Sequence, residues 1–236
     1  MVNYADLRNI LLYGALLLLF QGLTACDAAQ VPEQARQGQQ DTAAGKAEQS
    51  RLVVAFGDSL YAGYQLDPKQ GFAPQLQAAL RDKGFGVTVL NAGVSGDTTA
   101  AGLARLSFVL DNAPQEVEMV ILGLGGNDML RGIRPEETRA NLTAMMEELK
   151  RRKIDVVLTG MVAAPNLGAA YASKFNPIYT DLAKEYDAPL YPFFLDGVVT
   201  DKRLMLADGI HPNSDGVGNI VSKIEPIIAA ALTANE

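Results

Sequence analysis

The chain has 236 residues, of which 48% are hydrophobic and 20% charged, and its formal net charge is −7 at pH 7. This acidic balance, without a basic stripe along the sequence, argues against nucleic acid as a partner. The chain contains one histidine and one cysteine, which excludes an internal disulfide and a zinc site built from several such side chains.

An apolar run from Ile10 to Phe20 lies near the N-terminus, after Arg8. It is shorter than the roughly 20 residues that span a bilayer, and its length is typical of the apolar segment of a secretory signal. The alternative is a buried strand or helix of the fold. Because a polar stretch without aromatic residues follows it, we favour export, with residues 1–25 as a signal peptide.

The lone cysteine comes directly after this segment, in Leu23-Thr24-Ala25-Cys26. These residues resemble a bacterial lipobox, in which the cysteine is lipidated and becomes the new N-terminus. Cleavage by the ordinary signal peptidase near small residues is the alternative. Residues 26–50 are rich in Gln and Ala and cannot bury enough apolar surface to fold, which predicts a flexible tether. We therefore expect a periplasmic protein anchored to the membrane through a lipid on Cys26.

Residues 51–236 are predicted to form one domain in which apolar runs alternate with amphipathic helices. Strands are predicted at residues 52–56, 87–90, 117–122, 154–158 and 190–191. Helices are predicted around residues 72–80, 103–110, 135–149 and 173–186, with a last helix from about residue 213 that Pro226 is expected to kink. Strands that are apolar throughout and alternate with helices indicate a parallel sheet covered on both faces. The chemistry is then expected at the carboxyl ends of the strands.

Three polar, glycine-containing segments come directly after predicted strands. They are Gly57-Asp58-Ser59-Leu60, residues 91–97 and residues 123–128. Glycines at strand ends let the backbone turn sharply and approach a ligand.

A fourth segment, residues 208–212, precedes the last helix and contains the only histidine, His211, three residues after Asp208. Histidine is the usual general base near neutral pH. If the protein is a serine hydrolase, no residue other than His211 can supply the imidazole.

Taken in order, these segments resemble the four blocks of the SGNH (GDSL) hydrolases, and the resemblance extends over residues 51–236. Residues 122–128 and 182–189 resemble the bacterial arylesterase, thioesterase and lysophospholipase subgroup in particular. The resemblance implies a flavodoxin-like three-layer α/β/α fold around a five-stranded parallel sheet. It also implies an enzyme that needs neither a cofactor nor a metal ion.

Carried over to this sequence, the family pattern implies a catalytic triad of Ser59, Asp208 and His211. Ser59 is the nucleophile, His211 takes and returns its proton, and Asp208 orients the imidazole. The oxyanion hole would combine the Ser59 N–H, the Gly93 N–H and the side chain of Asn127. The implied reaction is hydrolysis of small acyl or aryl esters, and of thioesters or lysophospholipids, through an acyl-enzyme on Ser59.

Each of these residues also has a purely structural interpretation. Ser59 is suited to cap a helix, Asn127 and Asp128 are typical turn residues, and His211 would then be a loop residue without a catalytic role. The glycines near residue 125 resemble a dinucleotide loop, but Asp128 stands where its third glycine belongs. The four blocks at strand ends favour the hydrolase, and the missing Gly-x-Ser-x-Gly elbow disfavours an α/β-hydrolase.

Two other functions stay open at this point. One is an acyltransferase that uses the same catalytic machinery, and the other is a non-catalytic envelope protein that binds acylated polymers. The loops that would form an acyl pocket are those at residues 61–70, 129–134 and 163–171.

Overall fold

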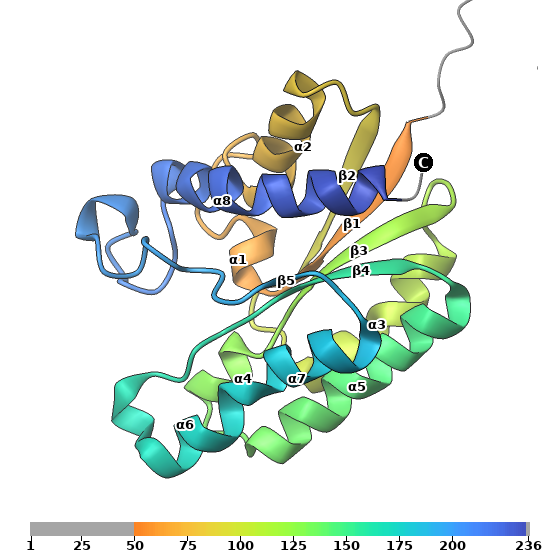
Figure 1. Cartoon of the computed structure of the whole chain (residues 1–236). Helices are drawn as coiled ribbons and strands as arrows, with labels where there is room; N and C mark the ends of the chain where they lie inside the picture. The colour runs from red at the N-terminus through yellow and green to blue at the C-terminus, as the bar shows by residue number, and fades with distance from the viewer. Residues whose placement is uncertain (1–49, 235–236) are drawn as a thin grey trace, which may run out of the picture. The chain divides into compact units, whose positions relative to one another are not determined.

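The computed structural model describes residues 50–234, and the predicted signal peptide, Cys26 and most of the tether lie outside the described residues (Figure 1). Its strands are β1 (Arg51–Gly57), β2 (Val87–Gly93), β3 (Val117–Gly123), β4 (Asp155–Thr159) and β5 (Leu190–Tyr191). Its α-helices are α1 (Ser59–Ala62), α2 (Phe72–Asp82), α3 (Thr99–Asp111), α4 (Gly126–Leu130), α5 (Pro135–Arg152), α6 (Ala169–Phe175), α7 (Pro177–Tyr186) and α8 (Ser214–Thr233). Two short 3-10 helices, η2 (Pro165–Leu167) and η3 (Lys202–Leu204), complete the described elements.

The strands form one parallel sheet in the order β2-β1-β3-β4-β5. This confirms the predicted α/β fold with a five-stranded parallel sheet. Strand β1, which lies between β2 and β3, ends level with both neighbours, because Gly57 pairs with Gly93 of β2 and with Gly123 of β3. The three segments that follow these strands therefore start from the same edge of the sheet.

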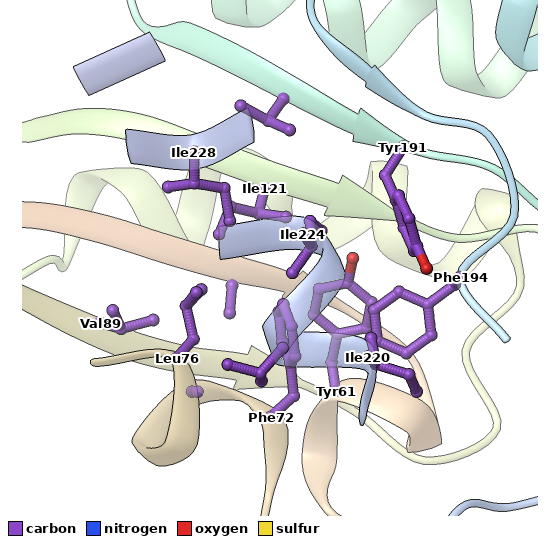
Figure 2. Packing of buried hydrophobic residues seen from close by; sticks show 14 of the residues in the cluster. Tyr61, Phe72, Leu76, Val89, Ile121, Tyr191, Phe194, Ile220, Ile224 and Ile228 are labelled. Carbon is purple, nitrogen blue, oxygen red and sulfur yellow. The ribbon is translucent and has the colours of Figure 1, made fainter. Parts of the chain in front are cut away.

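Both faces of the sheet are buried, and successive residues of β1 point to opposite faces. Val53 and Ala55 belong to the hydrophobic cluster under α2 and α8, whereas Leu52 and Val54 belong to the cluster under α3, α5 and α7. Figure 1 shows these two groups of helices on opposite sides of the sheet. Figure 2 shows the first cluster, in which side chains of α2 and α8 close over the sheet: Phe72, Leu76, Ile220, Ile224 and Ile228.

The helix predicted over residues 173–186 is two helices, α6 and α7, separated at Asn176. Pro177 occupies the first position of α7, and it has no N–H with which to continue the hydrogen bonds of α6. The Asn176 side chain instead accepts a hydrogen bond from the Ala163 N–H at 2.8 Å. The last helix starts as expected, with Asn213 as its N-cap, and Pro226 lies within it.

Within residues 50–234, none of the helices combines the length and the apolar character that crossing a membrane requires.

Candidate active site

Ser59 is the first residue of α1, directly after β1. The Asp58 side chain caps this helix, because its Oδ1 accepts a hydrogen bond from the Leu60 N–H at 3.0 Å. The buried ring of Tyr61 packs beneath the turn, so that a Cβ on Gly57 would lie 2.3 Å from a Tyr61 ring carbon. This close approach explains why glycine ends β1, and it fixes the turn that presents Ser59.

The three predicted triad residues meet in the structure. His211 Nε2 lies 2.8 Å from Ser59 Oγ, and His211 Nδ1 lies 2.7 Å from Asp208 Oδ2. The Asp208 carboxylate can only accept a hydrogen bond, so His211 carries its proton on Nδ1. Nε2 is then unprotonated and can accept the proton of Ser59. Residues 152 positions apart in the chain are thus joined into one hydrogen-bonded line.

Asp208 is held by the backbone of its own loop. Its Oδ1 accepts hydrogen bonds from the N–H groups of Ile210, at 2.9 Å, and of His211, at 3.0 Å. The hydrogen bond from the Ile210 N–H, followed by that from the His211 side chain, lowers the pKa of Asp208 to about 2. Asp208 is therefore ionised at neutral pH and can stabilise a positive charge on the imidazole.

The loop that carries Asp208 and His211 is closed at its base by backbone hydrogen bonds. The Leu206 N–H donates to the His211 carbonyl at 2.8 Å, and Met205 and Pro212 form an antiparallel bridge. Gly209 lies at φ +68, a left-handed conformation that glycine adopts without strain. The loop thus turns back on itself and brings His211 to the end of β1.

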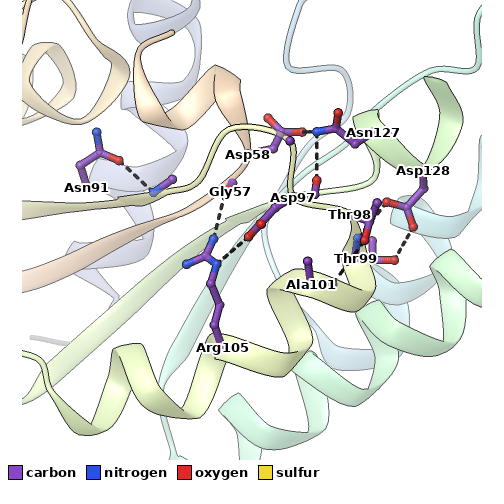
Figure 3. A network of polar contacts seen from close by, with 12 residues as sticks. Gly57, Asp58, Asn91, Asp97, Thr98, Thr99, Ala101, Arg105, Asn127 and Asp128 are labelled. Atoms are coloured by element: carbon purple, nitrogen blue, oxygen red, sulfur yellow. Dashed lines mark hydrogen bonds and ion pairs between the residues drawn. The ribbon is translucent and has the colours of Figure 1, made fainter. Parts of the chain in front are cut away.

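Asn127 comes from the third segment, where it is the second residue of α4 after β3. Its Nδ2 donates to the Asp97 carbonyl at 2.9 Å and contacts Asp58 Oδ2 at 3.3 Å. Figure 3 shows this amide between the two aspartates. The predicted side-chain donor of the oxyanion hole therefore lies beside the residue that precedes Ser59.

The N–H of Gly93 does not point in the direction that the predicted oxyanion role requires. On the edge strand β2 the following residue, Val94, donates its N–H to the Gly57 carbonyl of β1 at 3.1 Å. Adjacent N–H groups of a strand point to opposite sides, and the Gly93 N–H donates to Asn91 Oδ1 at 2.9 Å. The structure thus turns this N–H away from β1 and does not support the oxyanion role that the sequence suggested for Gly93.

A polar network behind the site was not anticipated from the sequence. Arg105 on α3 donates to Asp97 Oδ2 at 2.6 Å and to the Gly57 carbonyl at 3.0 Å, and its guanidinium lies 4.1 Å from the centroid of the Phe56 ring. Figure 3 shows that Arg105 joins the end of β1 to the segment that contacts Asn127. The sequence feature that could have indicated this role is the position of Arg105, three residues after Gly102 and therefore on the buried face of α3.

Asp58 is itself buried, with 3% of its surface exposed. Burial raises the pKa of its carboxyl group to about 6, although the hydrogen bond from the Leu60 N–H opposes this shift. An acidic group of this kind beside a nucleophile is typical of functional sites.

Asp128, the neighbour of Asn127, has a structural role. It is 1% exposed and accepts hydrogen bonds from the Thr99 N–H at 2.8 Å, from the Thr99 hydroxyl and from the Thr138 hydroxyl at 3.2 Å. These contacts join α3, α4 and α5. They fix the short helix from which Asn127 projects.

Several exposed apolar side chains lie in the same segments as the predicted site residues. Among the described residues, seven large hydrophobic side chains are exposed, and six of them lie in segments that follow strands or carry His211: Tyr64, Val94, Leu130, Val162, Val199 and Ile210. In a parallel sheet such segments share one edge. Between residues 50 and 234, no three His, Cys, Asp or Glu side chains are grouped so that they could hold a metal ion.

Known proteins are similar to this chain in sequence and fold. Residues 55–217 match the GDSL-like Lipase/Acylhydrolase family. Esterase TesA of Pseudomonas aeruginosa is 39% identical over 186 residues, which cover 79% of this chain and 90% of that protein. The arylesterase of Vibrio mimicus is 40% identical over 174 residues, covering 74% and 85% of the two chains.

Solved structures of esterases are also similar to this chain. The crystal structure of AlinE4, an SGNH-hydrolase family esterase, is 51% identical and superposes with a TM-score of 0.66, covering 78% of this chain and 97% of that one. The crystal structure of TesA is 38% identical with a TM-score of 0.70, covering 76% and 98%. The chain therefore belongs to the GDSL-like lipase/acylhydrolase family of SGNH hydrolases and is an enzyme of that family.

Proposed function

We propose that this protein hydrolyses carboxylic esters through an acyl-enzyme on Ser59. The observation that carries the proposal is the continuous line of hydrogen-bonding atoms from Ser59 Oγ through the imidazole of His211 to Asp208. A serine hydroxyl is a weak nucleophile on its own and needs an adjacent base. Here the only imidazole of the chain lies within hydrogen-bonding distance of it.

In the acylation step, Ser59 Oγ attacks the ester carbonyl carbon while its proton moves to His211 Nε2. The carbonyl electrons move to the oxygen and form a tetrahedral intermediate. When they return, the carbon–oxygen bond to the alcohol breaks and His211 gives its proton to the leaving oxygen. In deacylation, a water molecule gives a proton to His211 Nε2 while its oxygen attacks the acyl carbon. The bond from that carbon to Ser59 Oγ then breaks, His211 returns its proton to Oγ, and the carboxylic acid leaves.

The oxyanion would be stabilised by the Ser59 N–H and by the Asn127 side chain. The longer of the two Asn127 contacts, that with Asp58 at 3.3 Å, is the one that a bound oxyanion would replace. Asn127 contacts the segment after β2 at Asp97 rather than at Gly93. A backbone N–H near Gly96 is therefore the better candidate for the third donor of the oxyanion hole. Removing one such donor typically costs about 3–4 kcal/mol of transition-state stabilisation.

Turnover of 4-nitrophenyl acetate and butyrate tests the proposal. We expect hydrolysis by the wild type and a loss of at least about 10³-fold for Ser59→Ala and for His211→Ala. A fluorophosphonate probe should label the wild type and not Ser59→Ala. Wild-type rates in both variants, or equal labelling of Ser59→Ala, would rule out the acyl-enzyme.

The apolar rim of the site supports an acyl or aryl group as the part of the substrate that is recognised. Exposed apolar side chains around a reactive centre lower the free energy of a bound apolar chain. A chain-length series of esters and thioesters should therefore show kcat/KM rising from acetate toward longer acyl groups. Product analysis with and without an acceptor alcohol separates a hydrolase from an acyltransferase, and we expect the free acid to be the main product in both.

We further propose that the enzyme is exported and anchored to the cell envelope through a lipid on Cys26. The apolar run from Ile10 to Phe20, followed by Leu23-Thr24-Ala25-Cys26, supports this proposal. Metabolic labelling with a palmitate analogue should mark the wild type and not Cys26→Ser. Equal labelling of both proteins, or none of the wild type, would contradict the anchor.

A further inference from the structure

An aromatic side chain outside the triad lies against the catalytic base. The ring centroids of Tyr64 and His211 are 4.4 Å apart, and the two ring planes are inclined by 32°. Tyr64 is not a core residue, because 38% of its surface is exposed. Its hydroxyl accepts a hydrogen bond from Gln65 Nε2 at 3.2 Å, so the contact with the imidazole is made by the aromatic ring.

The backbone around Tyr64 is built to hold this ring in place. Gly63 ends α1 at φ +77, and Gln65 lies at φ +56, so two left-handed residues flank Tyr64. A residue other than glycine rarely adopts such a conformation unless its surroundings hold it there. The N–H groups of Gly63 and Tyr64 both donate to the carbonyl of Ser59, the latter at 3.2 Å. The turn that carries Tyr64 is therefore tied to the nucleophile, while its ring contacts the base.

The charge of the imidazole changes during the proposed reaction, and the face of an aromatic ring responds to that change. His211 is neutral when it accepts the proton of Ser59, and it becomes a cation as the tetrahedral intermediate forms. A cation within about 6 Å of an aromatic centroid is attracted by the partial negative charge of the ring face. Asp208 contacts the imidazole at Nδ1, whereas Tyr64 lies against the ring itself. The two side chains therefore act on the same charge from different directions.

We propose that Tyr64 is a positioning residue that stabilises the imidazolium of His211 in the transition state through its aromatic ring. This inference rests on the proposed acyl-enzyme mechanism. An interaction that is stronger in the transition state than in the resting enzyme raises kcat rather than tightening substrate binding. Because the site is partly exposed, the expected contribution is about two- to five-fold in rate.

A series of ring-fluorinated residues in place of Tyr64 tests this proposal. Fluorine withdraws electrons from the ring face with little change in ring size. We compare Tyr64→Phe with its mono-, di- and trifluorinated analogues, using 4-nitrophenyl acetate, whose small acyl group makes few contacts of its own. We expect Tyr64→Phe to retain the wild-type kcat within about two-fold, and log kcat to fall steadily with each added fluorine while KM stays constant.

Tyr64→Leu removes the aromatic ring and should show the full two- to five-fold loss of kcat. The same fluorinated series at Phe108, which is 70% exposed on α3, is the matched control and should leave kcat unchanged. Equal rates across the series at Tyr64 would overturn the role of its ring, since a packing contact does not respond to fluorine. In that case hydrolysis by the wild type and its loss in Ser59→Ala would leave the esterase proposal intact.

Discussion

The residues proposed for catalysis come from two regions that are built in opposite ways. The loop with Asp208 and His211 is mostly exposed, and its hydrogen bonds run within the loop and to Ser59. The strand ends with Asp58 and Asn127 belong to a network that includes a buried aspartate, Asp128, and reaches three helices. A substitution in the loop of Asp208 and His211 can thus leave the core undisturbed, whereas a substitution in the buried network cannot.

This difference predicts a separation between activity and stability. A substitution in the loop removes a catalytic group but leaves the packing of the sheet and its helices unchanged. A substitution in the buried network leaves donors or acceptors without partners inside the protein, which costs free energy of folding.

The largest expected effect is the loss of activity in Asp208→Asn. The Asn side chain can still accept from the backbone of the loop, but it presents N–H groups to His211 Nδ1. His211 then adopts the tautomer with its proton on Nε2 and cannot take the proton of Ser59. By analogy with the same change in a chymotrypsin-type triad, kcat should fall by about 10⁴-fold.

The free energy of unfolding of Asp208→Asn, measured in urea at pH 7, should fall by no more than about 1 kcal/mol, because the hydrogen bonds that lower the pKa of Asp208 are exposed to solvent. A fall in kcat of less than ten-fold would contradict the orienting role of Asp208. A large loss of stability would contradict the contrast between the two regions.

The next effect is on stability, in Asp128→Ala. This change leaves the buried N–H of Thr99 and the hydroxyl groups that donate to Asp128 without their acceptor. We expect the free energy of unfolding to fall by about 3–5 kcal/mol. The matched control is Asp181→Ala, which removes an exposed ion pair with Arg139 and should cost less than about 1 kcal/mol. Similar losses in the two variants would show that the buried network is not the stabilising element.

The same contrast explains which parts of the site the sequence could predict. The triad and the strand ends were predicted because short motifs and apolar runs are local features, and the topology of parallel strands brings their ends together. The direction of the Gly93 N–H depends on the pairing of β2 with β1, which no single segment encodes. Tyr64 and Arg105 likewise depend on contacts between segments that are distant in the chain.

Helix boundaries show the same limit at a smaller scale. The apolar periodicity over residues 173–186 is that of one helix, and it is continuous because α6 and α7 both contribute side chains to the same hydrophobic cluster. The interruption at Asn176 comes from Pro177 and from a hydrogen bond to Ala163, thirteen residues earlier in the chain. Apolar periodicity indicates which face of a helix is buried, but it does not indicate where the backbone hydrogen bonds of the helix end.

The smallest effect is a pH dependence that belongs to Asp58. Burial raises its pKa in the folded protein to about 6, against 3.8 for the ordinary group. The folded state therefore binds this proton more tightly than the unfolded state, and stability falls as the pH rises from about 3.8 to 6 and is level above it. Asp58→Asn cannot ionise, so its stability relative to the wild type should rise across this window by at most about 3 kcal/mol.

Unfolding of the two proteins in urea at pH 4, 5, 6 and 7 measures this difference, because every other titrating group is common to both. A difference that stays constant with pH would mean that Asp58 titrates alike in the folded and unfolded chains. We expect kcat of Asp58→Asn to be lower than that of the wild type. In the free enzyme the ionised Asp58 accepts the hydrogen bond of Asn127 and holds that side chain ready for the oxyanion, whereas an amide in its place presents an N–H to it. If Asp58→Asn is more stable than the wild type at pH 7 and has a lower kcat, the buried carboxylate lowers stability while it orients Asn127. No such opposition between stability and activity is expected in the exposed loop that carries His211.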